Sequence, residues 1–302
     1  MIHGTPTDDG SCERSMDANL DLDRLVGGAH HDPHSILGAH PGPDGLTIRT
    51  LRPLAERAEV LIDGRAWPME HLAHGVFAVV LPDLDKVPDY RLRVSYPGAP
   101  PYETHDPYRH WPTLGELDLH LISEGRHERL WEALGARVMR HEGVDGTAFT
   151  VWAPNARGVR VVGDFNHWNG CGHPMRSLGR SGVWELFVPG VGPGTKYKYE
   201  ILGVDGVWRT KADPMARRTE VPPATASVVE RSEYVWQDEE WMRRRAERNW
   251  LEEPMSIYEV RLGSWRPGLG YRELATELVD YVTDMGFTHV EFLPVAEHPY
   301  GP

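Results

Sequence analysis

Apolar and polar positions alternate with a period of two through much of the chain before residue 230, which is typical of half-buried β-strands. In Val183–Val188 successive residues would point to opposite faces of a sheet. In Tyr197–Ile201 three apolar side chains on one face alternate with Lys198 and Glu200 on the other. Turn-forming sequences such as Gly192–Gly194 separate these runs. The pattern predicts many short strands joined by tight connections.

The alternating pattern also repeats. One segment recurs at an offset of 101 residues, and three later segments recur at an offset of 107 residues, which leaves a six-residue loop insertion between them. Short strands in units of about 100 residues predict two tandem Ig-like β-sandwiches, each preceded by a short helix, over Leu20–Val26 and Arg126–Leu134. The matched pairs are Gly45–Ile62 with Gly146–Gly163, Gly75–Pro82 with Gly182–Pro189, Tyr90–Val94 with Tyr197–Ile201, and Asp106–Pro107 with Asp213–Pro214.

After Val229 the pattern changes. Glu239–Trp250 is charged and predicts a connecting helix, which Pro254 would end. Met255–Leu262 predicts a strand, Tyr271–Gly286 an amphipathic helix, and Thr288–Val295 a buried strand. Strand, helix and strand at these lengths form one βαβ unit with parallel strands.

The predicted fold class is therefore mainly β, with two tandem Ig-like β-sandwiches followed by the first βαβ unit of an incomplete (β/α)8 barrel. A closed barrel of that kind takes about 250 residues, whereas Ser256–Pro302 supplies 47. The predicted divisions are a disordered tail at 1–18, a first sandwich at 19–115, a second sandwich at 116–229, a linker helix at 230–254, and the barrel opening at 255–302.

Composition narrows the classes of partner. The 302 residues carry 32 Lys and Arg against 45 Asp and Glu, a net charge of -13, which opposes nucleic acid and anionic membranes as partners. Two cysteines, Cys12 and Cys171, are too few for a disulfide framework. We therefore expect a monomer in the cytoplasm, with no cofactor.

Several motifs resemble the amino-terminal portion of the bacterial 1,4-alpha-glucan (glycogen) branching enzymes of the alpha-amylase superfamily. The resemblance runs from about residue 20 to the end of the chain. Two positions depart from the family pattern, namely Arg261, where His is common, and Cys171-Gly172 in a turn that is often charged. The resemblance is carried by His30–His40 (HHDPHSILGAH), Val162–Trp168 (VGDFNHW), Tyr197–Glu200 (YKYE), Lys211–Pro214 (KADP), Tyr258–Trp265 (YEVRLGSW), Tyr271–Leu274 (YREL) and Met285–Pro299 (MGFTHVEFLPVAEHP).

The resemblance implies an enzyme that cleaves an α-1,4-glucan, holds the cut chain covalently and transfers it to a sugar 6-hydroxyl. Such retaining chemistry uses two carboxyl groups roughly 5 Å apart. In the family these residues follow later barrel strands, beyond Pro302. We therefore expect no catalytic residue in this chain, and expect the 302 residues alone to be inactive.

The resemblance also implies glucan-binding residues. Trp168 in GDFNHW, Lys198 in YKYE and Trp208 in DGVW match the positions that contact glucan in related glycogen-binding modules. Aromatic rings stack on the apolar faces of sugars. The alternative interpretation of Trp168 is a residue that packs the loop, and Trp184 is expected in the core.

Other polar clusters favour structural interpretations. Glu297 and His298 follow the last predicted strand but lack a catalytic partner. His30, His31 and His34 lack a second ligand cluster, so no metal site is expected. Arg243–Arg245 predicts a solvated helix face rather than a polyanion site.

Two further functions remain open. A non-catalytic glucan-binding or targeting protein would need only the second sandwich, although the βαβ unit has no role in such a protein. A debranching or trehalose-forming relative would carry one sandwich before its barrel rather than two. The tandem repeat and the YEVRLGSW motif favour the branching enzyme over both.

Overall fold

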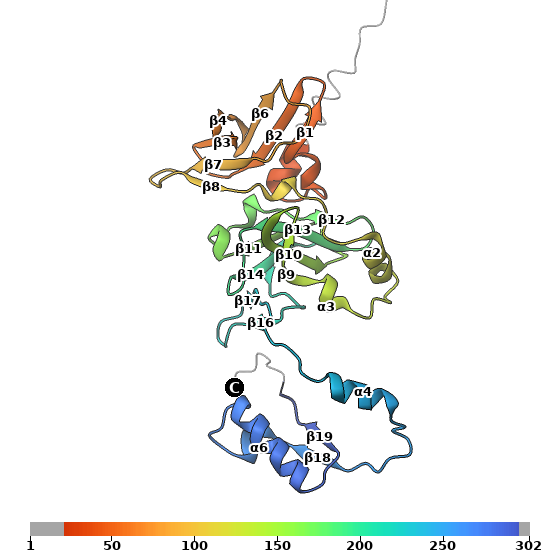
Figure 1. The fold of residues 1–302 in the computed structure, drawn as a ribbon. Helices are drawn as coiled ribbons and strands as arrows, with labels where there is room; N and C mark the ends of the chain where they lie inside the picture. The colour runs from red at the N-terminus through yellow and green to blue at the C-terminus, as the bar shows by residue number, and fades with distance from the viewer. Residues whose placement is uncertain (1–20, 296–302) are drawn as a thin grey trace, which may run out of the picture. The chain divides into compact units, whose positions relative to one another are not determined.

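A computed structural model describes residues 21–295. The chain forms two compact units, Met1–Arg231 and Ser232–Pro302, which are described separately (Figure 1). The described residues are mainly strands in antiparallel sheets, with few helices, as the alternating pattern predicts. Among these residues no helix has both the length and the apolar character that a membrane span needs.

The first module, residues 21–115, forms two four-stranded sheets with the orders β1-β2-β6-β5 and β4-β3-β7-β8. A helical segment at 21–27 precedes them, and short 3-10 turns η1 (Pro33–Ser35) and η2 (Pro107–Arg109) flank them. The strands are β1 (Gly38–Gly42), β2 (Gly45–Leu51), β3 (Arg57–Ile62), β4 (Arg65–Pro68), β5 (Glu70–Ala73), β6 (Val76–Leu81), β7 (Arg91–Ser95) and β8 (Tyr102–Thr104).

The second module, residues 116–229, repeats this plan. Its sheets have the orders β12-β13-β10-β9 and β11-β14-β17-β16, with β15 paired to β14. Two short turns, η3 (Asp164–Asn166) and η4 (Gly170–Gly172), follow β11. The strands are β9 (Gly135–His141), β10 (Val144–Trp152), β11 (Gly158–Gly163), β12 (Arg176–Ser177), β13 (Val183–Pro189), β14 (Lys196–Leu202), β15 (Trp208–Lys211), β16 (Arg218–Thr219) and β17 (Ser227–Val228).

Apolar residues from both sheets of each module share a core. In the first module Ile48 and Phe77 from one sheet pack with Val60 and Leu92 from the other. In the second module the core includes Trp184, which is 2% exposed, as the sequence predicts. Non-directional burial of these side chains holds the sheets of each module together.

The repeat extends to a buried polar pair. The Tyr90 hydroxyl donates to Asp106 Oδ2 at 2.7 Å, and 107 residues later the Tyr197 hydroxyl donates to Asp213 Oδ2 at 2.5 Å. Each aspartate also accepts a backbone N–H two residues on, from Tyr108 or from Met215. The second halves of the two modules therefore close in the same way.

The helix predicted over Arg126–Leu134 is wrong in its bounds. Helix α2 spans Glu116–Ser123, Gly125 follows at a φ of 67°, and the four-residue α3 spans Leu130–Ala133. Glycine with a positive φ favours the end of a helix, so the chain breaks where the sequence analysis placed a helix start. The helix predicted over Leu20–Val26 begins outside the described residues, and residues 21–27 are helical.

The second unit contains α4 (Glu239–Glu247), β18 (Ile257–Val260), α5 (Leu262–Trp265), α6 (Tyr271–Asp284) and β19 (His289–Phe292). Strands β18 and β19 pair in parallel, as predicted for a βαβ unit. Leu278 and Val282 of α6 pack with Val260 of β18, and Gly286 follows α6 at a φ of 78°. The crossover helix therefore covers one side of a two-stranded parallel sheet.

Candidate functional site

Trp168 lies in the loop that follows β11. Its indole is 41% exposed, and Nε1 donates to Asp164 Oδ1 at 3.2 Å. The other Asp164 oxygen accepts the Lys196 backbone N–H at 3.0 Å, which ties the loop to the start of β14. His167 and Trp168 have φ angles of 52° and 61°, an unusual conformation for large side chains. The loop holds an exposed aromatic ring at a cost in backbone strain.

Lys198 projects from the middle of β14, between two buried tyrosines. Because successive strand residues point to opposite faces, Tyr197 and Tyr199 enter the core while Lys198 faces outward. Its Nζ donates to Thr225 Oγ1 at 2.6 Å, and the side chain is half-buried. The ammonium group is thus held near the sheet surface.

Trp208 begins β15, opposite Leu202 of β14. The guanidinium carbon of Arg160 lies 4.3 Å from the centre of its ring, within the range of a cation–π contact. Arg160 also donates to the Val26 carbonyl at 3.3 Å and packs against Gly28, both in the first module. Arg160 therefore covers part of Trp208, and the sequence analysis missed it. Its signal is a charged residue within the otherwise apolar run of β11.

The strand register places Lys198 and Trp208 on the same face of one sheet. Directly opposed residues of an antiparallel pair share a face, and Trp208 opposes Leu202, four residues from Lys198, or roughly 13 Å along β14. The Trp168 loop leaves the sheet where Gly163 pairs with Tyr197, beside Lys198. The structure thus brings the Trp168 loop to the Lys198 end of this face and Trp208 to its opposite end.

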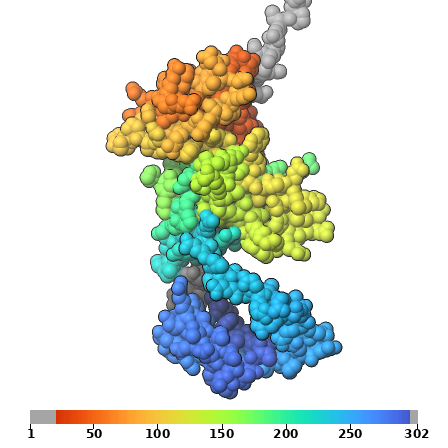
Figure 2. Space-filling model, viewed as in Figure 1, coloured from red at the N-terminus to blue at the C-terminus, as the bar shows by residue number. Residues whose placement is uncertain are grey.

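A groove between the first and second modules lies beside the same loop. Its volume is about 770 Å³, and its lining includes Tyr96, Tyr102 and His105 from the first module and Phe165 and His167 from the second. The two modules touch directly along this boundary (Figure 2). The sequence analysis did not predict this groove, because its two walls are far apart along the chain.

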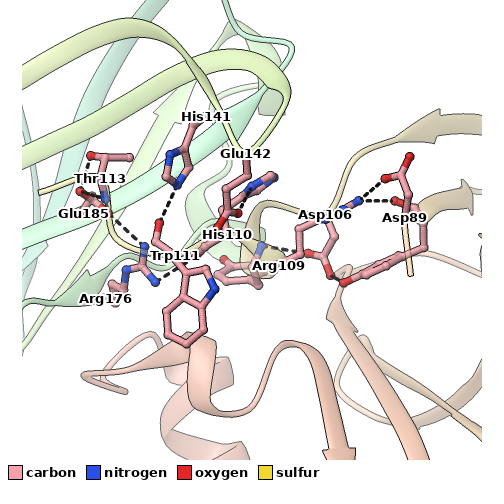
Figure 3. Close-up of polar contacts among 12 residues, drawn as sticks. Asp89, Asp106, Arg109, His110, Trp111, Thr113, His141, Glu142, Arg176 and Glu185 are labelled. Carbon is pink, nitrogen blue, oxygen red and sulfur yellow. Dashed lines mark hydrogen bonds and ion pairs between the residues drawn. The ribbon is translucent and has the colours of Figure 1, made fainter. Parts of the chain in front are cut away.

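The described residues include one cluster whose side chains could hold a metal ion, formed by His110, His141 and Glu142, whose ligand atoms lie within 4.8 Å of one another. His110 Nδ1 lies 2.9 Å from a Glu142 oxygen, and His141 Nε2 lies 2.9 Å from the Trp111 carbonyl (Figure 3). Burial lowers the pKa of His110 to about 4, although the Glu142 carboxylate opposes this shift. These hydrogen bonds fix the segment that joins the modules to the second module.

The other candidate clusters have structural contacts. The His31 ring packs against Trp184 and the His34 ring against Tyr108. Arg243 forms exposed ion pairs with acidic residues of α4. Glu297 and His298 lie outside the described residues.

The buried acidic side chains of the described residues are also bound by protein groups. Asp106 and Asp213 accept tyrosine hydroxyls. Glu185 is fully buried, accepts from the Thr113 hydroxyl and pairs with Arg176 at 3.0 Å. A carboxylate with its lone pairs bound in this way is poorly placed to act as a nucleophile or a proton donor.

Comparison with protein families first defines the class. Residues 133–216 match carbohydrate-binding module 48, the isoamylase N-terminal domain. This match covers β9 to β15 and all three predicted glucan-binding residues. The second module is thus of a carbohydrate-binding type.

Residues 18–108 match the N-terminal domain of the alpha-1,4-glucan branching enzyme GlgB. The first part of the chain therefore belongs to the GlgB N-terminal domain family, and the resemblance to bacterial branching enzymes predicted from the sequence is confirmed.

Curated relatives agree with both matches. The chain is 64% identical to the 1,4-alpha-glucan branching enzyme GlgB of Thermobifida fusca, over 93% of this chain and 38% of that protein. It is 61% identical to GlgB of Frankia casuarinae, over 93% and 35%, and 60% identical to GlgB 2 of Streptomyces coelicolor, over 98% and 40%. The chain thus spans well under half the length of these relatives.

Proposed function

We propose that the chain is the amino-terminal part of a 1,4-alpha-glucan branching enzyme and that its second module binds α-1,4-glucan. The observation that carries the proposal is the match of the whole described fold to branching enzymes at 60–64% identity. The branching reaction itself would use two carboxyl groups on opposite sides of the scissile bond, with a sugar hydroxyl in place of water in the second step.

The proposed architecture follows the family. Residues 19–115 and 116–229 form two Ig-like sandwiches, residues 230–254 link them to the next domain, and residues 255–302 open a (β/α)8 barrel. The parallel pairing of β18 with β19 across α6 supports the last assignment. The first module serves as a spacer or positions the substrate.

Trp168, Lys198 and Trp208 form the proposed glucan site. The exposed Trp168 ring offers a stacking surface, Lys198 a hydrogen-bond donor, and Trp208 the part of its ring that Arg160 leaves uncovered. An amphipathic sugar needs this combination of flat apolar surface and a few polar groups.

The test is migration of the chain through native gels that contain glycogen. Wild-type protein should be retarded, and the triple variant Trp168→Ala, Lys198→Ala, Trp208→Ala should migrate about as it does without glycogen. Trp131→Ala, which removes a ring of similar exposure on α3, is the matched control. Equal retardation of the triple variant and the wild type would show that glucan binds elsewhere.

A further inference from the structure

We propose that the groove between the first and second modules binds a short stretch of linear α-1,4-glucan, in addition to the site at Trp168, Lys198 and Trp208. This proposal rests on the proposed function, since it extends the same ligand to a second surface. The groove would place a glucan chain against both modules at once.

The size and composition of the groove suit an oligosaccharide. Its volume of about 770 Å³ falls within the range of roughly 300–1,000 Å³ that is usual for small-molecule sites. No aspartate or glutamate occurs among its described lining residues, so a metal cation would find no anionic ligand there. A neutral, amphipathic ligand fits this lining better.

Two tyrosines form an aromatic platform on the first-module wall. Tyr96 follows β7 and Tyr102 begins β8, and their rings are nearly parallel, with an interplanar angle of 8° and centroids 6.2 Å apart. Tyr102 is 45% exposed. Burial raises the pKa of Tyr96 to about 12, so its phenol stays protonated. The platform combines a flat apolar surface with hydroxyls that can donate and accept hydrogen bonds.

Unpaired polar atoms occur on the same wall. Arg52 Nε and His105 Nδ1 are buried and have no hydrogen-bond partner among the described residues, and both residues line the groove. Burial and the nearby cations Arg91 and Arg109 lower the pKa of His105, which keeps its ring neutral. Because a buried unpaired polar group is costly, sugar hydroxyls within the groove would gain by bonding to these atoms.

The opposite wall comes from the Trp168 loop. Phe165 stacks on the core ring of Phe149 with centroids 5.6 Å apart, and His167 is exposed at the groove and precedes Trp168 in the chain. A glucan in the groove would therefore end beside the residue proposed to bind glucan on the second module.

The two walls are fixed relative to one another before any ligand binds. The connecting segment is tied to the first module by Arg109, which donates to Asp89 at 2.8 Å (Figure 3). It is tied to the second module by His110 with Glu142 at 2.9 Å and by Thr113 with Glu185 at 2.6 Å. A preformed groove avoids much of the entropic cost of ordering loops on binding.

The experiment measures the affinity of the whole chain for maltoheptaose by calorimetry. Tyr102→Ala should raise Kd about five- to tenfold, since aromatic stacking and its buried area contribute on this scale. Ala99→Trp, which fills the groove from an exposed turn, should have a similar effect without removing a packed side chain. Tyr271→Ala, an exposed tyrosine on α6, is the matched control and should bind like the wild type.

The outcomes separate the two proposals. Wild-type affinity in both Tyr102→Ala and Ala99→Trp, together with weaker binding by Trp168→Ala, would overturn the groove and leave the proposed function standing. Weaker binding by both groove variants supports the groove, whatever Trp168→Ala does. No binding by the wild type would overturn both proposals. Complete displacement of maltoheptaose by inorganic phosphate would mark an anion site instead and overturn the groove as a glucan site.

Discussion

The first and second modules share a strand order but differ in the connection that follows β3 and β11. In the first module Asp63 and Gly64, at φ angles of 48° and 77°, turn the chain directly into β4, which pairs back onto β3. In the second module β11 is followed instead by η3 and the left-handed pair His167 and Trp168. One scaffold therefore carries a tight hairpin in one copy and an exposed aromatic loop in the other.

The modules also differ in how their sheets are covered. On β13 of the second module both faces are buried, because residues of α2 and α3 pack over the side that includes Val183, and Glu185 is paired with Arg176. The position 107 residues earlier is Ala78 of β6, and the neighbouring Val80 is 50% exposed. The second module thus has a larger buried interior than the first, while the hydrogen-bonded Tyr–Asp pair is common to both.

The largest expected effect tests this likeness. Asp106→Ala and Asp213→Ala should each lower the free energy of unfolding by about 3 kcal/mol, because each leaves a buried tyrosine hydroxyl and a backbone N–H unpaired. The loss should be somewhat greater for Asp213, which Tyr199 also approaches at 3.5 Å. Urea unfolding followed by tryptophan fluorescence measures both losses.

Asp89→Ala is the control for this comparison. Asp89 is 86% exposed at its side chain and pairs with Arg109, and exposed ion pairs contribute at most about 1 kcal/mol. If only one of the two buried aspartates mattered for stability, the pairs would not be equivalent despite their matching geometry.

A smaller effect distinguishes the second module through His173, which has no counterpart in the hairpin of the first. Burial and then Arg52 lower the pKa of His173 from 6.5 to about 3. The folded state therefore disfavours the charged ring, so stability present above pH 6.5 is lost as the pH falls toward 3. Between pH 7 and pH 5 this loss is about 2 kcal/mol.

His173→Asn removes the titrating ring while keeping a side chain that can accept from Asn166, as Nδ1 does at 3.2 Å. Urea unfolding at pH 7 and at pH 5 should show a smaller acid loss for the variant than for the wild type. Parallel losses in the two proteins would mean that His173 can be charged in the folded state at little cost.

Much of the fold could be predicted from the sequence because alternation and the repeat are local or pairwise patterns. The offset of 107 residues aligns Tyr90 with Tyr197 and Asp106 with Asp213, and the structure joins each pair by a hydrogen bond. The helix over Arg126–Leu134 was misplaced because a composition suited to a helix does not reveal that Gly125 ends the preceding one.

The site could be predicted only in part. Trp168, Lys198 and Trp208 follow from motifs, whereas the contact of Arg160 with Trp208 depends on how the first module packs against β11. The groove likewise joins residues such as Tyr102 and Phe165 that no short-range pattern connects. Contacts between modules require the tertiary arrangement, which local periodicity does not determine.

The smallest expected change in stability concerns the loop that distinguishes the modules. Trp168 adopts a φ of 61°, where a bulky residue is strained and glycine is not. Trp168→Gly should therefore raise the free energy of unfolding or leave it unchanged, by at most about 1 kcal/mol, although it removes the hydrogen bond to Asp164. The same variant should lose affinity for glycogen.

Asp63→Gly provides the matched change in the first module, since Asp63 is also left-handed, at a φ of 48°. Its stability should change by a few tenths of a kcal/mol, because aspartate tolerates this conformation better than tryptophan does, and glycogen retardation should be unaffected. A gain in stability together with a loss of binding, confined to Trp168→Gly, would mean that the second module retains a strained ring for recognition. A clear loss of stability in Trp168→Gly would instead identify Trp168 as a residue that packs the loop.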